Sequence, residues 1–222
     1  MPSFQQQRET LERWRRFPAL EWVESGVALT FDDGPDPDAT PAVLDALAAA
    51  GARAVFFLVG EQVEAHPELA RRVAEEGHVV ALHGFRHVEH DELGAGAQAD
   101  LERGAAAIAA ATGVDPRLYR PPYGRFSEHS YAAVEELGLT PVYWSAWGSD
   151  WEPIPAGRIA ETAIRDLAPG AIVLLHDSAR YATRPTAAPT AEALPAILAA
   201  MGERGLEPVA VPGPPARGPG ST

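Results

Sequence analysis

The sequence predicts an α/β fold, in which about seven parallel strands and their helices form one (β/α) barrel domain. Short apolar runs alternate with helical patterns along the chain, and parallel neighbours need such helical crossovers. No Gly-x-Gly-x-x-Gly follows the first apolar run, which disfavours an open doubly wound sheet. Polar residues follow several runs, as they do at the C-terminal ends of barrel strands, where we expect the functional site.

Helix boundary residues mark the first three strand-and-helix units. Thr40 and Pro41 supply an N-cap and a first helical position, and Gly51 is typical of the residue that follows a helix. Glycines also follow the second and third helical patterns. The predicted strands are 27–31, 54–59 and 78–82, and the helices that follow them are 42–50, 67–76 and 98–111.

The second half of the chain continues the alternation with shorter apolar runs. Its predicted strands are 118–119, 141–145, 171–175 and 208–211, with helices near 127–137, 157–168 and 190–204. Before the barrel, Leu11, Trp14 and Phe17 recur at helical spacing, which predicts a surface helix over 4–16. We therefore divide the chain into an N-terminal helical extension (1–24), the barrel domain (25–212) and a disordered tail (213–222).

Composition excludes several classes of function. The 222 residues include 18 Lys and Arg against 31 Asp and Glu, a formal charge of −13, so we expect no nucleic-acid partner. The chain has no Cys, so His and carboxylates must supply any metal ligands.

No apolar stretch approaches the roughly 20 residues of a membrane span. No export signal is present, so we expect a cytoplasmic protein, or a secreted one if a leader was removed. The oligomeric state stays open.

Charged or imidazole side chains follow five of the predicted strands. They are Asp32 and Asp33, His83 and His87, Arg120, Asp150, and His176 with Asp177. Each group alone has an ordinary explanation, because Asp-Gly-Pro is common in turns and a single His-x3-His is more often a surface feature. Their recurrence at one rim of the barrel favours a functional site.

His83 and His87 predict a metal site. In a helical turn, residues four apart share one face, with Cβ atoms about 5–6 Å apart, close enough to bind one ion. One of the adjacent carboxylates, Asp32 or Asp33, can supply the third ligand. Two imidazoles and one carboxylate leave positions open for water and substrate.

Five motifs in order carry a resemblance to a known family. Residues 30–35, Thr-Phe-Asp-Asp-Gly-Pro, followed by Thr40-Pro41, resemble the first motif of the polysaccharide deacetylase family, also called the NodB homology domain or carbohydrate esterase family 4. The other four motifs are His83-x3-His87, residues 117–124, Asp150-Trp151 and residues 173–177. The likeness covers about residues 25–212.

The resemblance implies a distorted (β/α) barrel that hydrolyses an acetamide with a divalent metal, commonly zinc, with cobalt or another divalent ion as the alternative. It implies that the metal is held by Asp33, His83 and His87. It implies that Asp32 is the general base paired with Arg120, and that His176 is the general acid tuned by Asp150. Trp151 and Leu174 would line a pocket for the acetyl methyl group, and the Tyr123 backbone N–H would stabilise the oxyanion.

Three positions depart from the family pattern. Gly84 stands where the family usually has Ser or Thr, and Val88 stands where Pro is common. These two changes predict a looser metal-binding loop. Trp147 stands where the fourth motif often has Asp, which predicts an additional aromatic wall near the substrate.

The expected reaction is removal of acetyl groups from an N-acetylated glycan, oligosaccharide or sugar conjugate. A small non-sugar amide, such as a formamide, cyclic imide or ureide, is the alternative substrate. Two other hypotheses are an iron oxygenase built on the two histidines and one carboxylate, and a glycan-binding module that has lost catalysis.

Overall fold

The computed structural model describes residues 15–213, and seven parallel strands form its framework. Their order in the sheet is β5-β4-β3-β2-β1-β7-β6, and every neighbouring pair is parallel. The strands are β1 (Ala28–Asp32), β2 (Val55–Leu58), β3 (Val79–Leu82), β4 (Leu118–Tyr119), β5 (Thr140–Pro141), β6 (Ala146–Trp147) and β7 (Ile172–His176). The sequence prediction of a parallel α/β barrel is confirmed.

The sheet is curled into a half-barrel, because its two edge strands are neighbours in the chain. Only residues 142–145 separate β5 from β6, and at about 3.3 Å per residue they span a short gap. The Val142 N–H donates to Tyr119 O (2.8 Å) on one edge, and the Ser145 N–H donates to Ile172 O (3.0 Å) on the other. The single strand predicted over 141–145 is wrong, because this segment changes its partner from β4 to β7.

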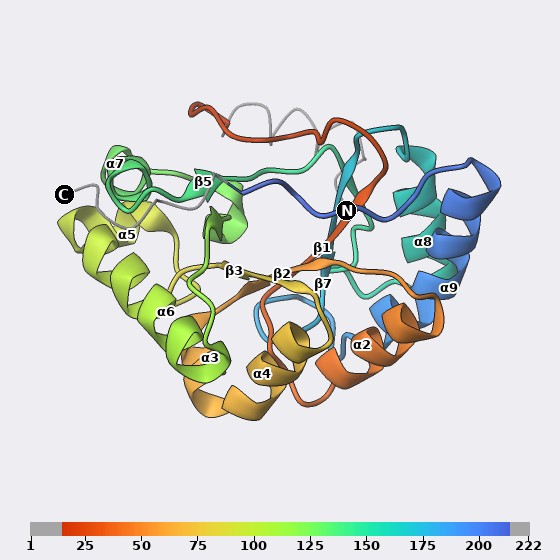
Figure 1. The fold of residues 1–222 in the computed structure, drawn as a ribbon, viewed down its shortest axis with the longest axis horizontal. Coiled ribbons are helices and arrows are strands. Elements are labelled where there is room, and N and C mark those ends of the chain that lie inside the picture. Colours follow the sequence, from red (N-terminus) through yellow and green to blue (C-terminus); the bar gives the residue numbers. More distant parts are fainter. Residues whose placement is uncertain (1–14, 214–222) are drawn as a thin grey trace.

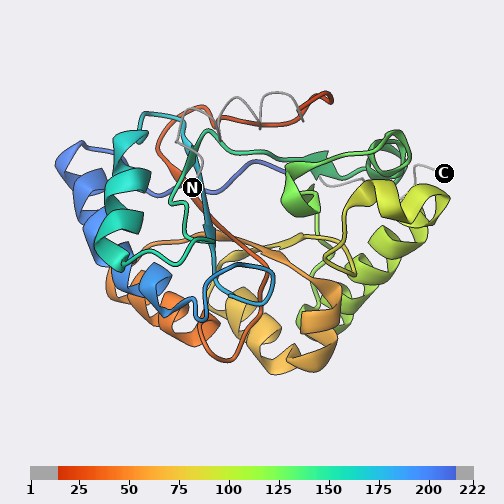
Figure 2. The ribbon, with the colours of Figure 1, turned by 180° about the vertical axis from the view of Figure 1, so that it is seen from behind.

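The helices cover the outside of the curled sheet. Figures 1 and 2 show them as a curved row that runs from α6 on one side, past α4 and α2, to α9 and α8 on the other. They are α2 (Thr40–Ala49), α3 (Gly60–Ala65), α4 (Pro67–Glu75), α5 (His90–Leu93), α6 (Ala97–Thr112), α7 (Glu128–Glu136), α8 (Ala156–Arg165) and α9 (Ala188–Glu203). Short 3-10 turns lie at Gly94–Gly96 and Pro122–Gly124. The helix α3 was not predicted, because its six residues are too few for a clear period.

The central strands are buried on both faces. Every residue of β1 and β2 is buried, and the rings of Phe31 and Phe56 stack with centroids 5.0 Å apart. Burying one such side chain contributes about 1.5–3 kcal/mol, so these strands form a rigid base for the residues at their ends. Asp32 is the last residue of β1 and His176 the last of β7, and the two are paired in register.

Of the predictions about the ends of the barrel, one is wrong and another lies mostly outside the described residues. Residues 208–211 form only an isolated bridge, between Pro208 and Val27, because proline has no N–H with which to extend a ladder. Most of the predicted helix over 4–16 lies outside the described residues, and Arg15 and Arg16, which are described, are not helical. Residues 214–222 of the predicted tail also lie outside them, and the domain boundaries stay predictions. Across 15–213 no helix is long and apolar enough to cross a membrane.

Candidate active site

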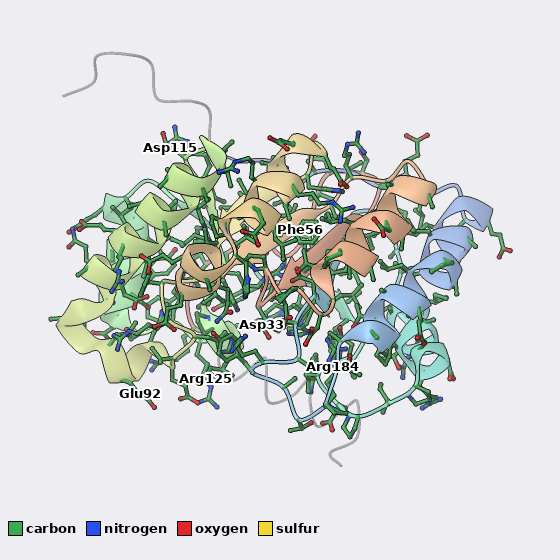
Figure 3. All side chains as sticks on the ribbon, turned by 90° about the horizontal axis from the view of Figure 1, so that it is seen from below. Asp33, Phe56, Glu92, Asp115, Arg125 and Arg184 are labelled. Carbon is green, nitrogen blue, oxygen red and sulfur yellow. The ribbon has the colours of Figure 1, made fainter. Side chains whose placement is uncertain are left out.

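A cavity of about 410 Å³ opens where the strands end, as the sequence predicted. Figure 3 shows Asp33, Arg125 and Arg184 toward this edge of the molecule, with Asp115, which precedes β4, toward the opposite edge. The predicted site residues that line the cavity are Asp32, Asp33, His83, His87, Tyr123, Trp151, Leu174 and His176. The remaining two, Arg120 and Asp150, lie behind this surface, and each contacts a lining residue directly.

Asp32 is held by a fully buried arginine. Arg120 Nη1 donates to Asp32 Oδ1 (2.7 Å) and to Thr30 Oγ1 (2.8 Å), and Nη2 donates to the Tyr143 carbonyl (2.9 Å). Its guanidinium also lies 4.1 Å from the centroid of the Phe57 ring. Burial lowers the pKa of Arg120, and the Asp32 carboxylate opposes this shift. The Asp32 carboxylate in the cavity is therefore paired with, and hydrogen-bonded to, the guanidinium of Arg120.

Asp33 faces the two histidines instead. Its Oδ1 lies 3.5 Å from His83 Nε2 and 3.2 Å from His87 Nε2, and one ligand atom from each of the three residues lies within 4.8 Å of the others. Burial alone raises the pKa of Asp33, but the two imidazoles outweigh it and hold the pKa well below its usual range. The two adjacent aspartates thus point to different partners.

This group fits a divalent cation. Asp33 Oδ1 is buried and has no hydrogen-bond partner among the described residues. His83 Nδ1 lies 2.8 Å from the Arg120 carbonyl, which only accepts hydrogen bonds, so Nδ1 carries the proton. Nε2 of His83, which faces Asp33, is then the nitrogen available to a metal, and this is the usual arrangement of a metal-binding histidine and its supporting carbonyl.

The loop that carries the two histidines is fixed by Asp100, which the sequence analysis missed. Asp100 Oδ2 accepts from the N–H of Phe85 (2.8 Å) and, more weakly, of Arg86 (3.4 Å). Gly84 has φ +85°, and a Cβ there would lie 3.3 Å from the same Asp100 oxygen. A carboxylate from α6 thus holds the loop backbone, and glycine suits the left-handed conformation of residue 84, while the looser loop stays a prediction.

The opposite side of the cavity holds a histidine–carboxylate pair. His176 Nδ1 lies 2.8 Å from Asp150 Oδ1, and Asp150 Oδ2 accepts from the His176 N–H (2.8 Å) and from Thr190 Oγ1 (2.7 Å). Arg184 donates to the same hydroxyl of Thr190 (2.6 Å). Burial lowers the pKa of His176, but the Asp150 carboxylate outweighs it and the pKa rises to about 9. His176 is therefore protonated at neutral pH.

Aromatic and apolar side chains form the walls of the cavity. Trp151 packs edge-on against the His176 ring (5.8 Å, 83°), and Leu174 lies on the same side in β7. Tyr123 is 46% exposed and adopts φ 57°, a left-handed conformation that is costly for a non-glycine residue and common at functional sites. Trp147 does not line the cavity. It lies in β6 opposite Leu174 and is buried in the core, so the predicted extra wall is wrong.

Asp177 is a second residue that had no predicted role. It is fully buried, and its Oδ2 accepts a hydrogen bond from Thr40 Oγ1 (2.5 Å). A Cβ on Gly34 would lie 2.2 Å from that oxygen, so Asp177 packs directly against the backbone that follows Asp33. Burial, with a contribution from Asp33, raises the pKa of Asp177 to about 7. The sequence signal that could have identified Asp177 as a site residue was its position next to His176 in the fifth motif.

Comparison with known proteins agrees with this geometry. A family model described as polysaccharide deacetylase matches residues 23–142. The chain is 37% identical over 196 residues to a chitooligosaccharide deacetylase of Bradyrhizobium sp. (strain ANU 289), covering 82% of this chain and 86% of the relative. It is 34% identical over 157 residues to a peptidoglycan-N-acetylglucosamine deacetylase of Bacillus cereus, covering 68% of this chain and 56% of the relative.

A solved structure extends the agreement to the whole fold. The family 4 carbohydrate esterase from Streptomyces lividans in complex with acetate superposes with a TM-score of 0.75 at 32% identity, covering 83% of this chain and 92% of that one. Because the family model spans more than half of the chain, and because relatives above 30% identity extend over most of it, the chain belongs to the polysaccharide deacetylase family, carbohydrate esterase family 4.

Proposed function

We propose that this enzyme removes the acetyl group from N-acetylated amino sugars of an oligosaccharide, polysaccharide or sugar conjugate. One observation carries the proposal: a carboxylate paired with Arg120, Asp32, and an imidazole paired with Asp150, His176, lie in one cavity with the Asp33, His83 and His87 group. The chitooligosaccharide and peptidoglycan deacetylases among its relatives support an acetylated amino sugar over a small non-sugar amide.

Deacetylases of this family are metal-dependent, and Asp33, His83 and His87 would hold the metal. Zinc is our proposal for the ion, because two imidazoles and one carboxylate form a ligand set that zinc prefers and leave positions open. A bound zinc ion polarises a carbonyl and lowers the pKa of water to about 7.

Asp32 would act as the general base. A free aspartic acid has a pKa of about 3.9, which is too low to deprotonate bulk water but adequate for an activated one. Arg120 pairs with Asp32 and fixes the carboxylate in the cavity through the 2.7 Å contact with Nη1. The free oxygen Oδ2 lies 3.8 Å from His83 Nε2, so it is directed toward the metal group.

His176 would act as the general acid. An amine leaves an acetamide poorly unless it is protonated, so a proton donor is required on the leaving-group side. Asp150 keeps that proton on His176 until the bond to the amine breaks. The Tyr123 backbone N–H would stabilise the oxyanion, and Trp151 with Leu174 would contact the acetyl methyl group.

Acetate release tests this proposal directly. The metal-free protein is loaded with zinc or cobalt and incubated with chitooligosaccharides of increasing length, and in parallel with formamides and cyclic imides. We expect acetate only from the acetylated sugars, and loss of the reaction after chelation. Glycan binding without acetate release would contradict the proposal and support the binding-module alternative, whereas faster hydrolysis of an imide or formamide would support the small-amide alternative. The cytoplasmic location stays a prediction.

A further inference from the structure

The two histidines of the metal group differ in what contacts their second ring nitrogen. His83 Nδ1 has the Arg120 carbonyl at 2.8 Å. His87 Nδ1 is buried and has no hydrogen-bond partner among the described residues. A metal-binding histidine is usually oriented by a hydrogen bond at this nitrogen. His87 must therefore be oriented by other contacts.

Aromatic rings supply these contacts. The ring of Tyr181 is stacked on His87, with centroids 4.1 Å apart and planes only 9° from parallel. The ring of Tyr123 meets His87 nearly edge-on, at 4.6 Å and 70°. Only the stacked ring of Tyr181 covers a whole face of the imidazole. It therefore restricts rotation of the imidazole out of its plane more than the edge-on ring of Tyr123 does. Tyr181 is also part of the cavity wall.

Tyr181 is itself anchored to the element that supports the metal-binding loop. Its hydroxyl accepts a hydrogen bond from Gln62 Nε2 (3.1 Å), and Gln62 is a buried residue of α3. The first residues of α3 also bond to the loop, because the N–H of Gly60 donates to Gly84 O and that of Glu61 donates to Phe85 O, both at 2.9 Å. One short helix thus holds both the loop backbone and the ring that covers His87.

The segment that carries Tyr181 is fixed at both ends. Before it, Ser178 Oγ donates to Asp36 Oδ2 (2.6 Å), and after it the Thr183 N–H donates to the Trp151 carbonyl (3.1 Å). These bonds connect the segment to the loop after β1 and to the acid side of the cavity. The ring of Tyr181 is consequently held in place before any ligand arrives.

We propose that Tyr181 is a positioning residue for the metal: its ring, anchored through Gln62, sets the orientation of His87 in place of the missing hydrogen bond. This inference rests on the proposed function, since it takes His87 as a metal ligand. The ring of Tyr181 would thus orient His87 as the Arg120 carbonyl orients His83. Removing the ring should weaken metal binding without changing the ligand set.

Metal affinity measured by competition with a chromophoric chelator tests the inference without reference to catalysis. For Tyr181→Leu and the more flexible Tyr181→Met we expect zinc binding to weaken about tenfold, the lower end of the effect of removing a ligand's supporting partner. Tyr181→Phe keeps the stacked ring and should restore affinity to within about twofold of the wild type, because only the bond to Gln62 is lost.

Tyr131 provides the matched control. It is also a partly buried tyrosine that stacks on a ring, Phe17 (4.8 Å, 22°), and its hydroxyl donates to the Pro18 carbonyl (3.0 Å). It does not line the cavity, so Tyr131→Leu should leave zinc affinity unchanged. Thermal unfolding of the metal-free variants, compared with the wild type, separates a loss of fold from a loss of metal.

The visible spectrum of the cobalt-loaded protein gives a second readout, because it responds to the angles at which the ligands meet the ion. We expect the bands to change in Tyr181→Leu and to return in Tyr181→Phe. Equal zinc affinity and equal cobalt spectra for wild type and Tyr181→Leu would overturn this inference alone. A wild-type chain that binds no metal would overturn the proposed function, and the role of Tyr181 with it.

Discussion

On one side of the cavity a chain of hydrogen bonds holds His176, whereas on the other side the ring of Tyr181 stacks on His87 and the ring of Tyr123 meets His87 nearly edge-on. The acid-side chain runs from His176 to Asp150 and on to Thr190 and Arg184. The carboxylate in that chain raises the pKa of the His176 imidazole. The comparison teaches that charge supports the residue proposed as the proton donor, whereas an aromatic ring orients the residue proposed as a metal ligand.

Asp32, the proposed base, is supported by the charge and the hydrogen bond of Arg120, and removing that partner should have the largest effect on stability. Arg120→Met leaves Asp32 buried with an unpaired charge, so we expect the free energy of unfolding to fall by about 3–5 kcal/mol and acetate release to be lost. Urea unfolding of the metal-free protein measures the change. The double variant Asp32→Asn with Arg120→Met removes both charges and should recover part of the stability. A loss below about 1 kcal/mol in the single variant would show that the pair is not desolvated.

Asp150→Asn removes the negative charge beside His176 and keeps nearly the same side-chain shape. Because Asp150 raises the pKa of His176, its loss lowers that pKa, and the basic limb of the kcat/KM profile moves to lower pH. At pH 8 we expect a fall of about a hundredfold. A profile that decreases in height at every pH, with unmoved limbs, would show that Asp150 acts through position alone.

The same pair links folding to pH in the metal-free protein. The pKa of His176 rises from its ordinary value of 6.5 to about 9, so its stabilising effect is complete below about pH 6.5 and is lost as the pH rises through about 9. Urea unfolding between pH 6 and 10 should show this decline in the wild type and a smaller one in Asp150→Asn. If the stability of both proteins declined identically with pH, a titratable group other than His176 would be responsible.

Thr190→Val should have a smaller effect on the same side of the cavity. It removes one hydrogen bond to Asp150 Oδ2 while the other partners of that carboxylate remain, so we expect kcat to fall about fivefold. Thr162→Val, a buried threonine of α8 away from the cavity, is the matched control and should leave kcat unchanged. A similar loss in both variants would point to a general loss of packing.

The residues that meet at the strand ends were predictable, because a parallel sheet brings every carboxyl end to one edge. Asp33, His83 and His87 follow β1 and β3, and the structure places them within 4.8 Å of one another. The family motifs added the proposed roles of the two residues behind the surface, Arg120 and Asp150, whose types alone do not identify a role. Metal identity and residue roles remain proposals.

The supporting residues were not predictable, since they come from segments without periodicity. Tyr181 and Arg184 lie between β7 and α9, where nothing in the sequence sets the path of the backbone. Trp147 was placed near the substrate because it stands where the fourth motif often has Asp, but it lies in β6 and is buried in the core. Arg15 packs over Tyr143 and donates to the Trp144 carbonyl (2.6 Å), a long-range contact that no local pattern predicts.

The central claim is that two adjacent aspartates do different work, Asp32 with a proton and Asp33 with a metal. Metal content and acetate release, measured side by side in Asp32→Asn and Asp33→Ala, test it most directly. We expect Asp32→Asn to bind as much metal as the wild type while turnover falls about a thousandfold, and Asp33→Ala to lose both. Equal metal loss in the two variants, or full turnover in Asp32→Asn, would contradict the account.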